Sequence, residues 1–133
     1  MDIFDNLSEK QKEAVQTIDE DLEIIACAGA GKTGVVTRRI VNILRVRPDI
    51  QPENIVAFTF TKKAAEELKS RINEYGKAVL GHTKGFAHMY VGTIHGFCIR
   101  MLQDYIPKFQ KFSVLDEIQT KLFVERYYDE CGM

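Results

Sequence analysis

A glycine-rich stretch near the start of the chain, IIACAGAGKTGVV, contains the residue types that bind phosphate. Gly29 and Gly31 can take backbone conformations closed to other residues, which lets a tight turn point its N–H groups at an anion. In the pattern GxxxxGK[ST], Lys32 would reach the β and γ phosphates of a nucleotide, and the Thr33 hydroxyl would bind Mg²⁺. Ala26 replaces the first glycine of that pattern. A strand pattern before the stretch and a helix pattern after it favour a phosphate-binding loop over a plain glycine turn with a surface lysine.

A second stretch, FSVLDEIQTK, contains the acidic pair Asp116 and Glu117. Such a pair binds the metal and orients the water in nucleotide hydrolases, where it ends a strand buried on both faces. A buried strand needs about four to six apolar residues, but polar residues interrupt the approach here and only two apolar residues directly precede Asp116. Asp116 and Gln119 have the spacing of a capping box. We therefore predict that the pair caps a helix and is not catalytic.

The elements that must position these residues follow a repeating order. Three short apolar runs, at residues 22–28, 54–59 and 89–93, each lead into a segment of helical period, and we expect the runs to be strands. Gly76 is expected to end the second helix and Pro107 to end the third. This alternation predicts an α/β fold with a parallel sheet flanked by helices, in three α/β/α layers. Ligands then bind at the carboxyl ends of the strands.

Composition narrows the class of protein. The 133 residues are 45% hydrophobic with a formal charge of −1, so the chain can form a packed core, and nucleic acid would have to bind at a local patch. The start MDIFDNLSEK is acidic, and no apolar run is long enough to span a membrane. Three widely spaced cysteines favour reduced thiols over disulfides or zinc. We expect a cytoplasmic protein without membrane contact.

Two of the three histidines, His82 and His88, make no metal-ligand spacing with cysteines or carboxylates. They lie in LGHTKGFAHMY, a glycine-containing connection that we expect to be a surface loop.

Four motifs in a fixed order resemble one family. LSEKQKEAV, then AxxGxGKT, then FTFTKKAAEELKSRI, then VGTIHGFCIRML resemble the superfamily 1 DNA helicases of the UvrD/Rep/PcrA type. The alanine at position 26 is usual in that family. The resemblance covers residues 7 to about 102.

The resemblance implies an ATP site. Gln11 would recognise adenine, although Ser8 and Gln11 also have capping-box spacing and the two roles can alternate. Lys32 and Thr33 would act in catalysis, with Mg²⁺ on Thr33. The residues expected to bind the nucleotide are Gln11, Ala28, Gly29, Ala30, Gly31, Lys32, Thr33 and Gly34.

The resemblance also implies a site for single-stranded DNA. Phe60 would stack on a base, although it could instead be a core residue on the same strand face as Phe58. Threonine hydroxyls would meet phosphates, and Thr61 and Thr93 could equally be helix N-caps. The family has Asn where this chain has Lys62. The residues expected to contact DNA are Thr59, Phe60, Thr61, Lys62, Thr93 and His95.

As a whole, the chain looks like part of a helicase. Residues 1–106 would be the N-terminal part of a RecA-like, P-loop (Walker A) motor domain, and residues 107–133 the start of an inserted helical subdomain. The resemblance implies an ATP-dependent DNA helicase of the DNA-repair type, moving 3′ to 5′ on single strands and at single/double-strand junctions. Its partner would be the rest of the helicase chain, and these 133 residues alone are expected to be inactive.

Three other classes of protein share parts of this pattern. A helicase–nuclease subunit of the recombination type shares these motifs. A nucleotide-dependent DNA-binding module that does not hydrolyse ATP would also carry them. A small-metabolite kinase is disfavoured by the FTFT and GTIH segments.

Overall fold

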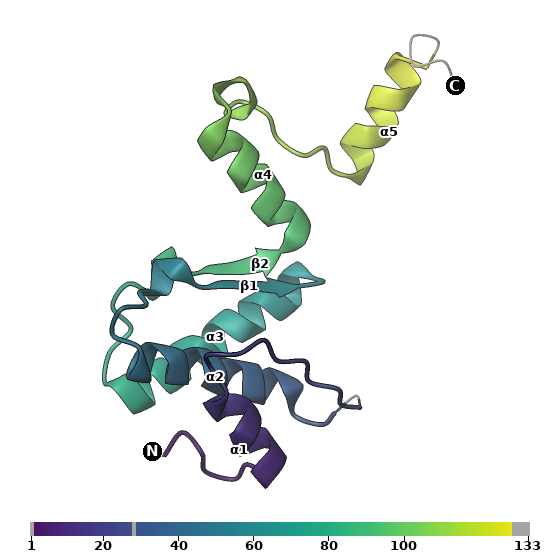
Figure 1. Cartoon of the computed structure of the whole chain (residues 1–133). Helices are drawn as coiled ribbons and strands as arrows, with labels where there is room; N and C mark the ends of the chain where they lie inside the picture. The colour runs from purple at the N-terminus through teal and green to yellow at the C-terminus, as the bar shows by residue number, and fades with distance from the viewer. Residues whose placement is uncertain (1, 28, 129–133) are drawn as a thin grey trace. The chain divides into compact units, whose positions relative to one another are not determined.

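The computed structural model describes residues 2–27 and 29–128 (Figure 1). The chain divides into two units, Met1–Phe97 and Cys98–Met133, which are described separately. The elements of the first unit, in chain order, are α1 (Glu9–Gln16), α2 (Lys32–Val46), the 3-10 helix η1 (Pro52–Asn54), β1 (Val56–Thr59), α3 (Lys62–Leu80), the 3-10 helix η2 (Phe86–His88), β2 (Tyr90–Thr93) and the first turn of α4 (Ile94–Tyr105).

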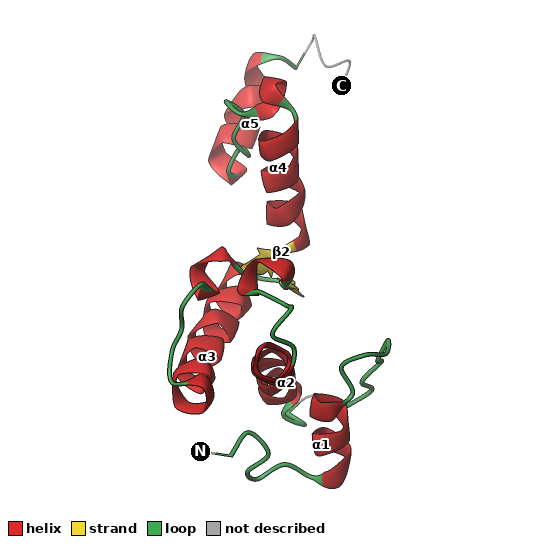
Figure 2. Cartoon of the chain, turned by 60° about the vertical axis from the view of Figure 1, so that its left-hand side comes forward, coloured by secondary structure: helices red, strands yellow, loops and turns green. Residues whose placement is uncertain are grey.

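The strands β1 and β2 lie side by side and run parallel, as predicted for two of the three apolar runs. Their register pairs Val56 with Tyr90 and Thr59 with Thr93, so both strands end at the same edge of the sheet. Helices α2 and α3 pack together on one face of the pair (Figures 1 and 2). The core between them consists of Ile40, Ala65, Leu68, Ile72, Phe86, Met89 and Val91.

The expected first strand is absent. Residues 22–27 form a loop, Ile25 is 89% exposed, and Ala28 lies outside the described residues. A strand needs a neighbour that accepts and donates its backbone hydrogen bonds. Within the described residues the sheet has two strands, and neither pairs with this segment. The α/β class is confirmed for this pair of strands and its helices, while the larger RecA-like sheet stays a prediction.

Helix α3 corrects a second prediction, because Gly76 does not end it. The helix continues to Leu80, and Gly81 ends it with a left-handed φ of +76°. Gly76 is buried within the helix, where a Cβ atom would lie 2.3 Å from Cε2 of Phe86. The glycine is therefore required by a close approach between two elements.

The segment between α3 and β2 is not purely the surface loop that the sequence predicts. The segment contains η2, and both Phe86 and Met89 are buried in the core. Apolar side chains within a polar, glycine-containing connection gain from burial like those of regular elements. His82 and His88 remain exposed.

The second unit contains the rest of α4, the 3-10 helix η3 (Pro107–Phe109) and α5 (Glu117–Arg126). Helix α4 ends two residues before Pro107, as predicted. Asp116 is the N-cap of α5, in a capping box with Gln119, which confirms its predicted role as a helix cap. Residues 129–133, part of the predicted subdomain 107–133, lie outside the described residues. In the described ranges, no helix combines the length and apolar character of a membrane span.

Candidate functional site

The glycine turn before α2 has the backbone geometry that an anion site requires. Gly29 and Gly31 have φ values of +79° and +77°, in the left-handed region that glycine occupies without strain. The N–H of Ala30 donates to the carbonyl of Cys27 at 3.2 Å, which closes the turn. Gly31 is the N-cap of α2 and supplies no side-chain acceptor. The first N–H groups of α2 therefore point toward a space where an anion would meet the positive end of the helix dipole.

Lys32 places its charge inside this turn. Its Nζ donates to the carbonyls of Ala26 at 2.6 Å and Cys27 at 2.7 Å. Across the described residues, no carboxylate lies within ion-pair distance of Lys32. Thr33 follows in the first turn of α2 and is exposed. An ammonium group held by neutral carbonyls, beside an exposed hydroxyl, fits a phosphate with its divalent cation.

The Gln11 side chain forms a hydrogen bond through each end of its amide. Its Oε1 accepts from the N–H of Ser8 at 2.9 Å, and the Ser8 hydroxyl accepts from the N–H of Gln11 at 3.4 Å. The predicted capping box is therefore confirmed. At the same time its Nε2 donates to the carbonyl of Ala30 at 3.2 Å. Gln11 thus ties the start of α1 to the glycine turn, which places it beside the region where a nucleotide would bind.

The FTFT segment leaves its aromatic ring in solvent. Phe60 is 99% exposed and follows the end of β1, so the alternative of a core phenylalanine is wrong. Thr59 Oγ1 donates to the carbonyl of Thr61 at 2.9 Å, while Thr61 Oγ1 accepts from the N–H of Ala64 at 3.1 Å and caps α3. Lys62 is exposed in the first turn of α3. The end of β1 and the start of α3 thus carry two threonine hydroxyls, an exposed aromatic ring and a lysine side chain within four consecutive residues.

The GTIHG segment lies at the same edge of the sheet. Thr93 ends β2 opposite Thr59, and its Oγ1 accepts from the N–H of Gly96 at 3.2 Å. This hydroxyl therefore serves the start of α4 like an N-cap. His95 is exposed one residue into the helix. The two segments that resemble DNA-contacting motifs are brought to neighbouring strand ends.

A cavity of about 490 Å³ lies between the first turn of α2 and the end of β1. It is lined by apolar side chains of α2, β1 and α3 and by polar residues at the start of α2 and the end of β1. Gln11, Thr93 and His95 do not line it. Its lining residues are Lys32, Thr33, Val36, Phe58, Thr59, Phe60, Thr61, Ala64 and Leu68.

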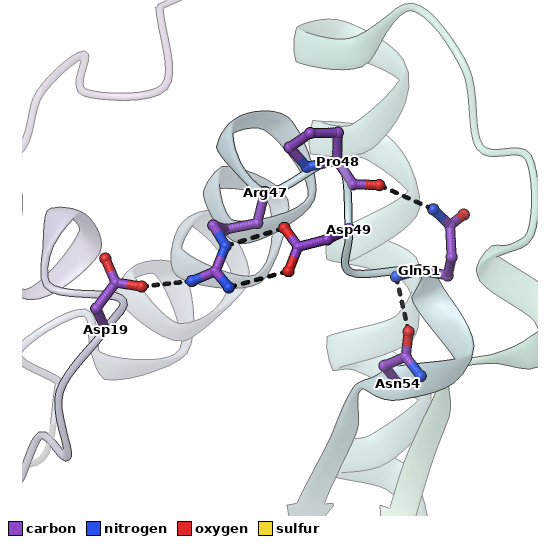
Figure 3. A network of polar contacts seen from close by, with 6 residues as sticks. All are labelled: Asp19, Arg47, Pro48, Asp49, Gln51 and Asn54. Atoms are coloured by element: carbon purple, nitrogen blue, oxygen red, sulfur yellow. Dashed lines mark hydrogen bonds and ion pairs between the residues drawn. The ribbon is translucent and has the colours of Figure 1, made fainter.

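Arg47 ties the chain between α1 and the glycine turn to the end of α2 (Figure 3). It forms an ion pair with Asp19 and two hydrogen bonds of 3.0 Å with Asp49. The hydrogen bonds with Asp49 raise the pKa of Arg47, and the same contact lowers the pKa of Asp49. Sequence reasoning missed this cluster, since nothing in the spacing of Asp19 and Arg47 marks them as partners.

Sequence reasoning also missed the packing of Tyr90 against the turn at Thr93. Tyr90 donates a hydrogen bond to the carbonyl of Thr93 and lies against Gly92 and Gly96. One signal was present in the sequence, because Tyr90 and Gly92 alternate along a strand and so share a face.

Helices packed on a parallel strand pair, with a glycine turn that opens a helix, define an α/β protein with a candidate anion site. The chain belongs to the UvrD/REP helicase N-terminal domain family, which it matches over residues 7–131.

Curated relatives include proteins called ATP-dependent DNA helicase PcrA. The protein of Bacillus subtilis strain 168 is 38% identical over 117 residues, which are 86% of this chain and 15% of the relative. The protein of Staphylococcus epidermidis strain ATCC 12228 is 36% identical over 123 residues, 90% of this chain and 16% of the relative. That of Staphylococcus aureus strain Mu50 is 33% identical over 126 residues, 92% of this chain and 16% of the relative. The chain thus spans about a sixth of the length of these relatives.

Proposed function

We propose that this chain is the ATP-binding and single-stranded-DNA-contacting N-terminal part of an ATP-dependent DNA helicase. One observation carries the proposal: Lys32 and Thr33, which follow the glycine turn in the first turn of α2, line the same cavity as Thr59, Phe60 and Thr61 at the end of β1. Such proximity suits a motor, because adjoining elements offer a direct route by which nucleotide occupancy can alter the grip on nucleic acid.

On the nucleotide side, the phosphates of ATP would lie in the glycine turn. Lys32 would exchange the carbonyls of Ala26 and Cys27 for phosphate oxygens. Bound Mg·ATP would supply a phosphoanhydride bond whose hydrolysis releases free energy. Thr33 would hold the metal by its hydroxyl, and Gln11 would turn its amide to adenine. The remaining contacts would come from Ala28, Gly29, Ala30, Gly31 and Gly34.

On the DNA side, Phe60 would stack on a base. Stacking suits a motor, since every base has a π-face and the contact does not depend on sequence. Thr59, Thr61 and Lys62 would contact the phosphate backbone beside the ring, and Thr93 with His95 would do so at the end of β2. The exposed positions of Phe60, Lys62 and His95 support this assignment.

At the level of the full-length protein, we propose a 3′ to 5′ helicase that acts on single strands and at junctions. The names of the relatives support the activity. Residues 1–106 would belong to the first motor domain and residues 107–133 to an inserted helical subdomain. The glutamate that orients the attacking water would come from elsewhere in the protein, because Asp116 of the acidic pair is engaged as a helix cap. The arginine groups that stabilise the γ-phosphate would also come from elsewhere in the protein.

ATP hydrolysis by the full-length protein tests this proposal. Lys32→Ala should reduce single-stranded-DNA-stimulated hydrolysis by a factor of about a hundred or more, since it removes the charge that faces the transferred phosphate. Lys63→Ala, at an exposed position in the first turn of α3, is the matched control and should leave the rate unchanged. A Lys32→Ala variant with the unaltered rate would refute the nucleotide site.

A second variant tests the role of the acidic pair. Asp116→Asn keeps a side-chain oxygen that can cap α5, and asparagine is as good an N-cap as aspartate. Hydrolysis should therefore stay within about twofold of the unaltered protein if Asp116 only caps the helix. A loss as large as that of Lys32→Ala would instead assign the pair to the metal and the attacking water.

A further inference from the structure

The phenol of Tyr90 contacts the turn that carries the proposed DNA-binding residues Thr93 and His95. Its hydroxyl donates a hydrogen bond to the carbonyl of Thr93 at 2.9 Å. That carbonyl belongs to the peptide that joins β2 to α4. The contact therefore acts on the backbone of the turn from the side opposite the core residue Val91.

Two glycines make this contact possible. A Cβ atom on Gly92 would lie 2.6 Å from the Tyr90 hydroxyl oxygen, and one on Gly96 would lie 2.9 Å from it. Both separations are shorter than real Cβ contacts, so a side chain at either place would displace the phenol. The absence of side chains at Gly92 and Gly96 thus leaves space for the Tyr90 hydroxyl group.

Two more aromatic rings pack against the ring of Tyr90 and hold it in this position. Phe97, on the first turn of α4, packs edge-on against Tyr90 with ring centroids 4.9 Å apart. Phe58, on β1, does the same at 6.2 Å and also contacts Phe97 at 5.3 Å. The cluster joins β1, β2 and the start of α4. Because Phe58 lines the cavity shared with Lys32, the cluster also borders the proposed nucleotide site.

We propose that Tyr90 is a positioning residue for DNA binding, which sets the direction in which the Thr93 turn presents its hydroxyl, its N–H groups and His95 to a phosphate. The inference rests on the proposed DNA contact of that turn. The Thr93 hydroxyl accepts from the N–H of Gly96, and the Tyr90 hydroxyl donates to the Thr93 carbonyl. A turn held by two hydrogen bonds needs less ordering when DNA binds.

Tyr90→Phe in the full-length protein removes the hydroxyl and keeps the ring cluster. Affinity for a fluorescent oligothymidylate should fall by about three- to tenfold, the loss expected for one hydrogen bond. Affinity for a fluorescent ATP analogue should stay within twofold. The carbonyl ¹³C resonance of Thr93 should shift as its hydrogen bond is lost. Unchanged DNA affinity, or equal losses for DNA and nucleotide, would overturn the proposal, because a purely structural role affects both ligands together.

A double-mutant cycle tests the close approach of the Tyr90 hydroxyl to Gly96. Gly96→Ala forces its methyl group against the Tyr90 hydroxyl, whereas in the Tyr90→Phe background the remaining close neighbour is Thr93 Oγ1 at 3.2 Å. Gly96→Ala should therefore weaken DNA binding less in the Tyr90→Phe protein than in the unaltered one. Additive losses would contradict the proposed geometry. Tyr105→Phe, which removes an exposed hydroxyl further along α4, is the matched control.

Two further variants separate this inference from the proposed function. Phe60→Ala and Thr93→Val alter residues assigned to DNA directly. If both weaken oligothymidylate binding and Tyr90→Phe does not, Tyr90 has no positioning role and the DNA site stands. If none of the three weakens binding, the DNA site itself is refuted and the inference falls with it.

Discussion

The ring of Phe60 is 99% exposed, although phenylalanine is among the residues that most often lie inside a protein. Phe60→Ala should therefore leave the Tm of the protein unchanged within about 1 °C, since little apolar area is lost on removal of the ring. Affinity for single-stranded DNA should fall by a factor of about 5 to 150, from a stacking energy of about 1–3 kcal/mol. Thermal unfolding and fluorescence anisotropy measure the two effects.

Phe86 is the matched control for this experiment, because it is the same residue type in the core. Phe86→Leu should lower the free energy of unfolding by about 1 kcal/mol or more, as the smaller side chain leaves space beside α3. DNA affinity per folded molecule should be unchanged. A loss of stability in Phe60→Ala as large as that in Phe86→Leu would mean that Phe60 is packed in solution.

Arg38 is a buried charge whose partners are neutral. Its guanidinium donates to the carbonyls of Ile3 at 3.1 Å and Asp5, and to the Tyr75 hydroxyl at 2.8 Å. It also lies over the Tyr75 ring, 5.0 Å from the centroid. Arg38→Met should lower the free energy of unfolding by about 2–4 kcal/mol, because two carbonyls and a phenol lose charged donors.

Denaturant unfolding measures the effect of Arg38→Met. Tyr75→Phe removes one acceptor and keeps the ring, so it should cost about 1 kcal/mol. Arg71→Ala, which breaks an exposed ion pair with Glu67 on α3, should cost less than about 0.5 kcal/mol. Equal effects of the Arg38 and Arg71 changes would show that the buried guanidinium contributes nothing beyond a surface charge.

At the scale of elements, Gly76 sets how closely α3 approaches η2. Alanine is favoured over glycine in a helix by about 1 kcal/mol, but a Cβ here would lie 2.3 Å from Phe86. Overpacking of a core costs about 1–3 kcal/mol, so Gly76→Ala should be destabilising. Combining it with Phe86→Leu should relieve the clash and bring the double variant close to Phe86→Leu alone.

Gly34 provides the comparison for Gly76. It lies in α2, and a Cβ there would meet nothing within 4 Å. Gly34→Ala should therefore raise the free energy of unfolding by about 0.5–1 kcal/mol through helix propensity. Urea unfolding of both variants measures the two stability changes. If Gly34→Ala is also destabilising, the effect of Gly76→Ala would be assigned to helix geometry and not to the contact with Phe86.

The Arg47 cluster joins the end of α2 to the loop that leads into the glycine turn, and it should make stability depend on acid. Asp49 has its pKa lowered from 3.8 by its hydrogen bonds with Arg47. A carboxylate with a lowered folded-state pKa stabilises the protein above its ordinary pKa, and this contribution disappears as pH falls through the folded value. Asp49→Asn should therefore lower Tm at neutral pH, and this effect should diminish as the pH falls below the ordinary pKa of an aspartate.

The same variant should respond to salt. All three groups of the cluster are exposed in part, so 1 M NaCl should reduce the Tm difference at neutral pH. Asp21→Asn, at an exposed aspartate before the glycine turn, should leave Tm unaltered at either pH. A Tm difference for Asp49→Asn that persists in acid would mean that the asparagine acts by packing and not by charge.

Local sequence signals predicted the features that depend on neighbouring residues. The capping boxes at Ser8 and Asp116 and the N-cap at Thr61 follow from spacing within one element, and the parallel strand pair follows from the alternation of strand and helix patterns. Features that depend on which particular distant residues meet were missed or wrong. The run at 22–27 is not a strand, and its apolar pattern contained no information about which strand would pair with it.

The candidate site divides in the same way. The glycine turn was predictable, because the glycines that take left-handed conformations and the lysine that follows them lie close together in the sequence. The exposure of Phe60 was not, since strand alternation gave it the same expected face as Phe58. The shared cavity of Lys32 and Thr59 depends on how α2 and β1 meet, which spacing alone does not determine.

At the scale of the whole molecule, the two units differ in how much apolar surface they bury. The first has a core that includes Val41 and Ile40 of α2 and Leu68 of α3. In the second, α5 buries no residue, and Ile118 is 72% exposed. Because local opening is easiest where few apolar contacts are broken, the helices should differ in hydrogen exchange.

Amide exchange measured by mass spectrometry should be at least about a hundredfold slower in α2 than in α5, a difference of about 3 kcal/mol in opening free energy. Val41→Ala should speed exchange in α2, because it removes a fully buried side chain. Asp116→Ala removes the cap of α5 and should speed exchange there. Equal protection of α2 and α5 would mean that apolar burial within each unit does not set its stability. Slow exchange in α2 that survives Val41→Ala would locate the stabilising contacts outside this core.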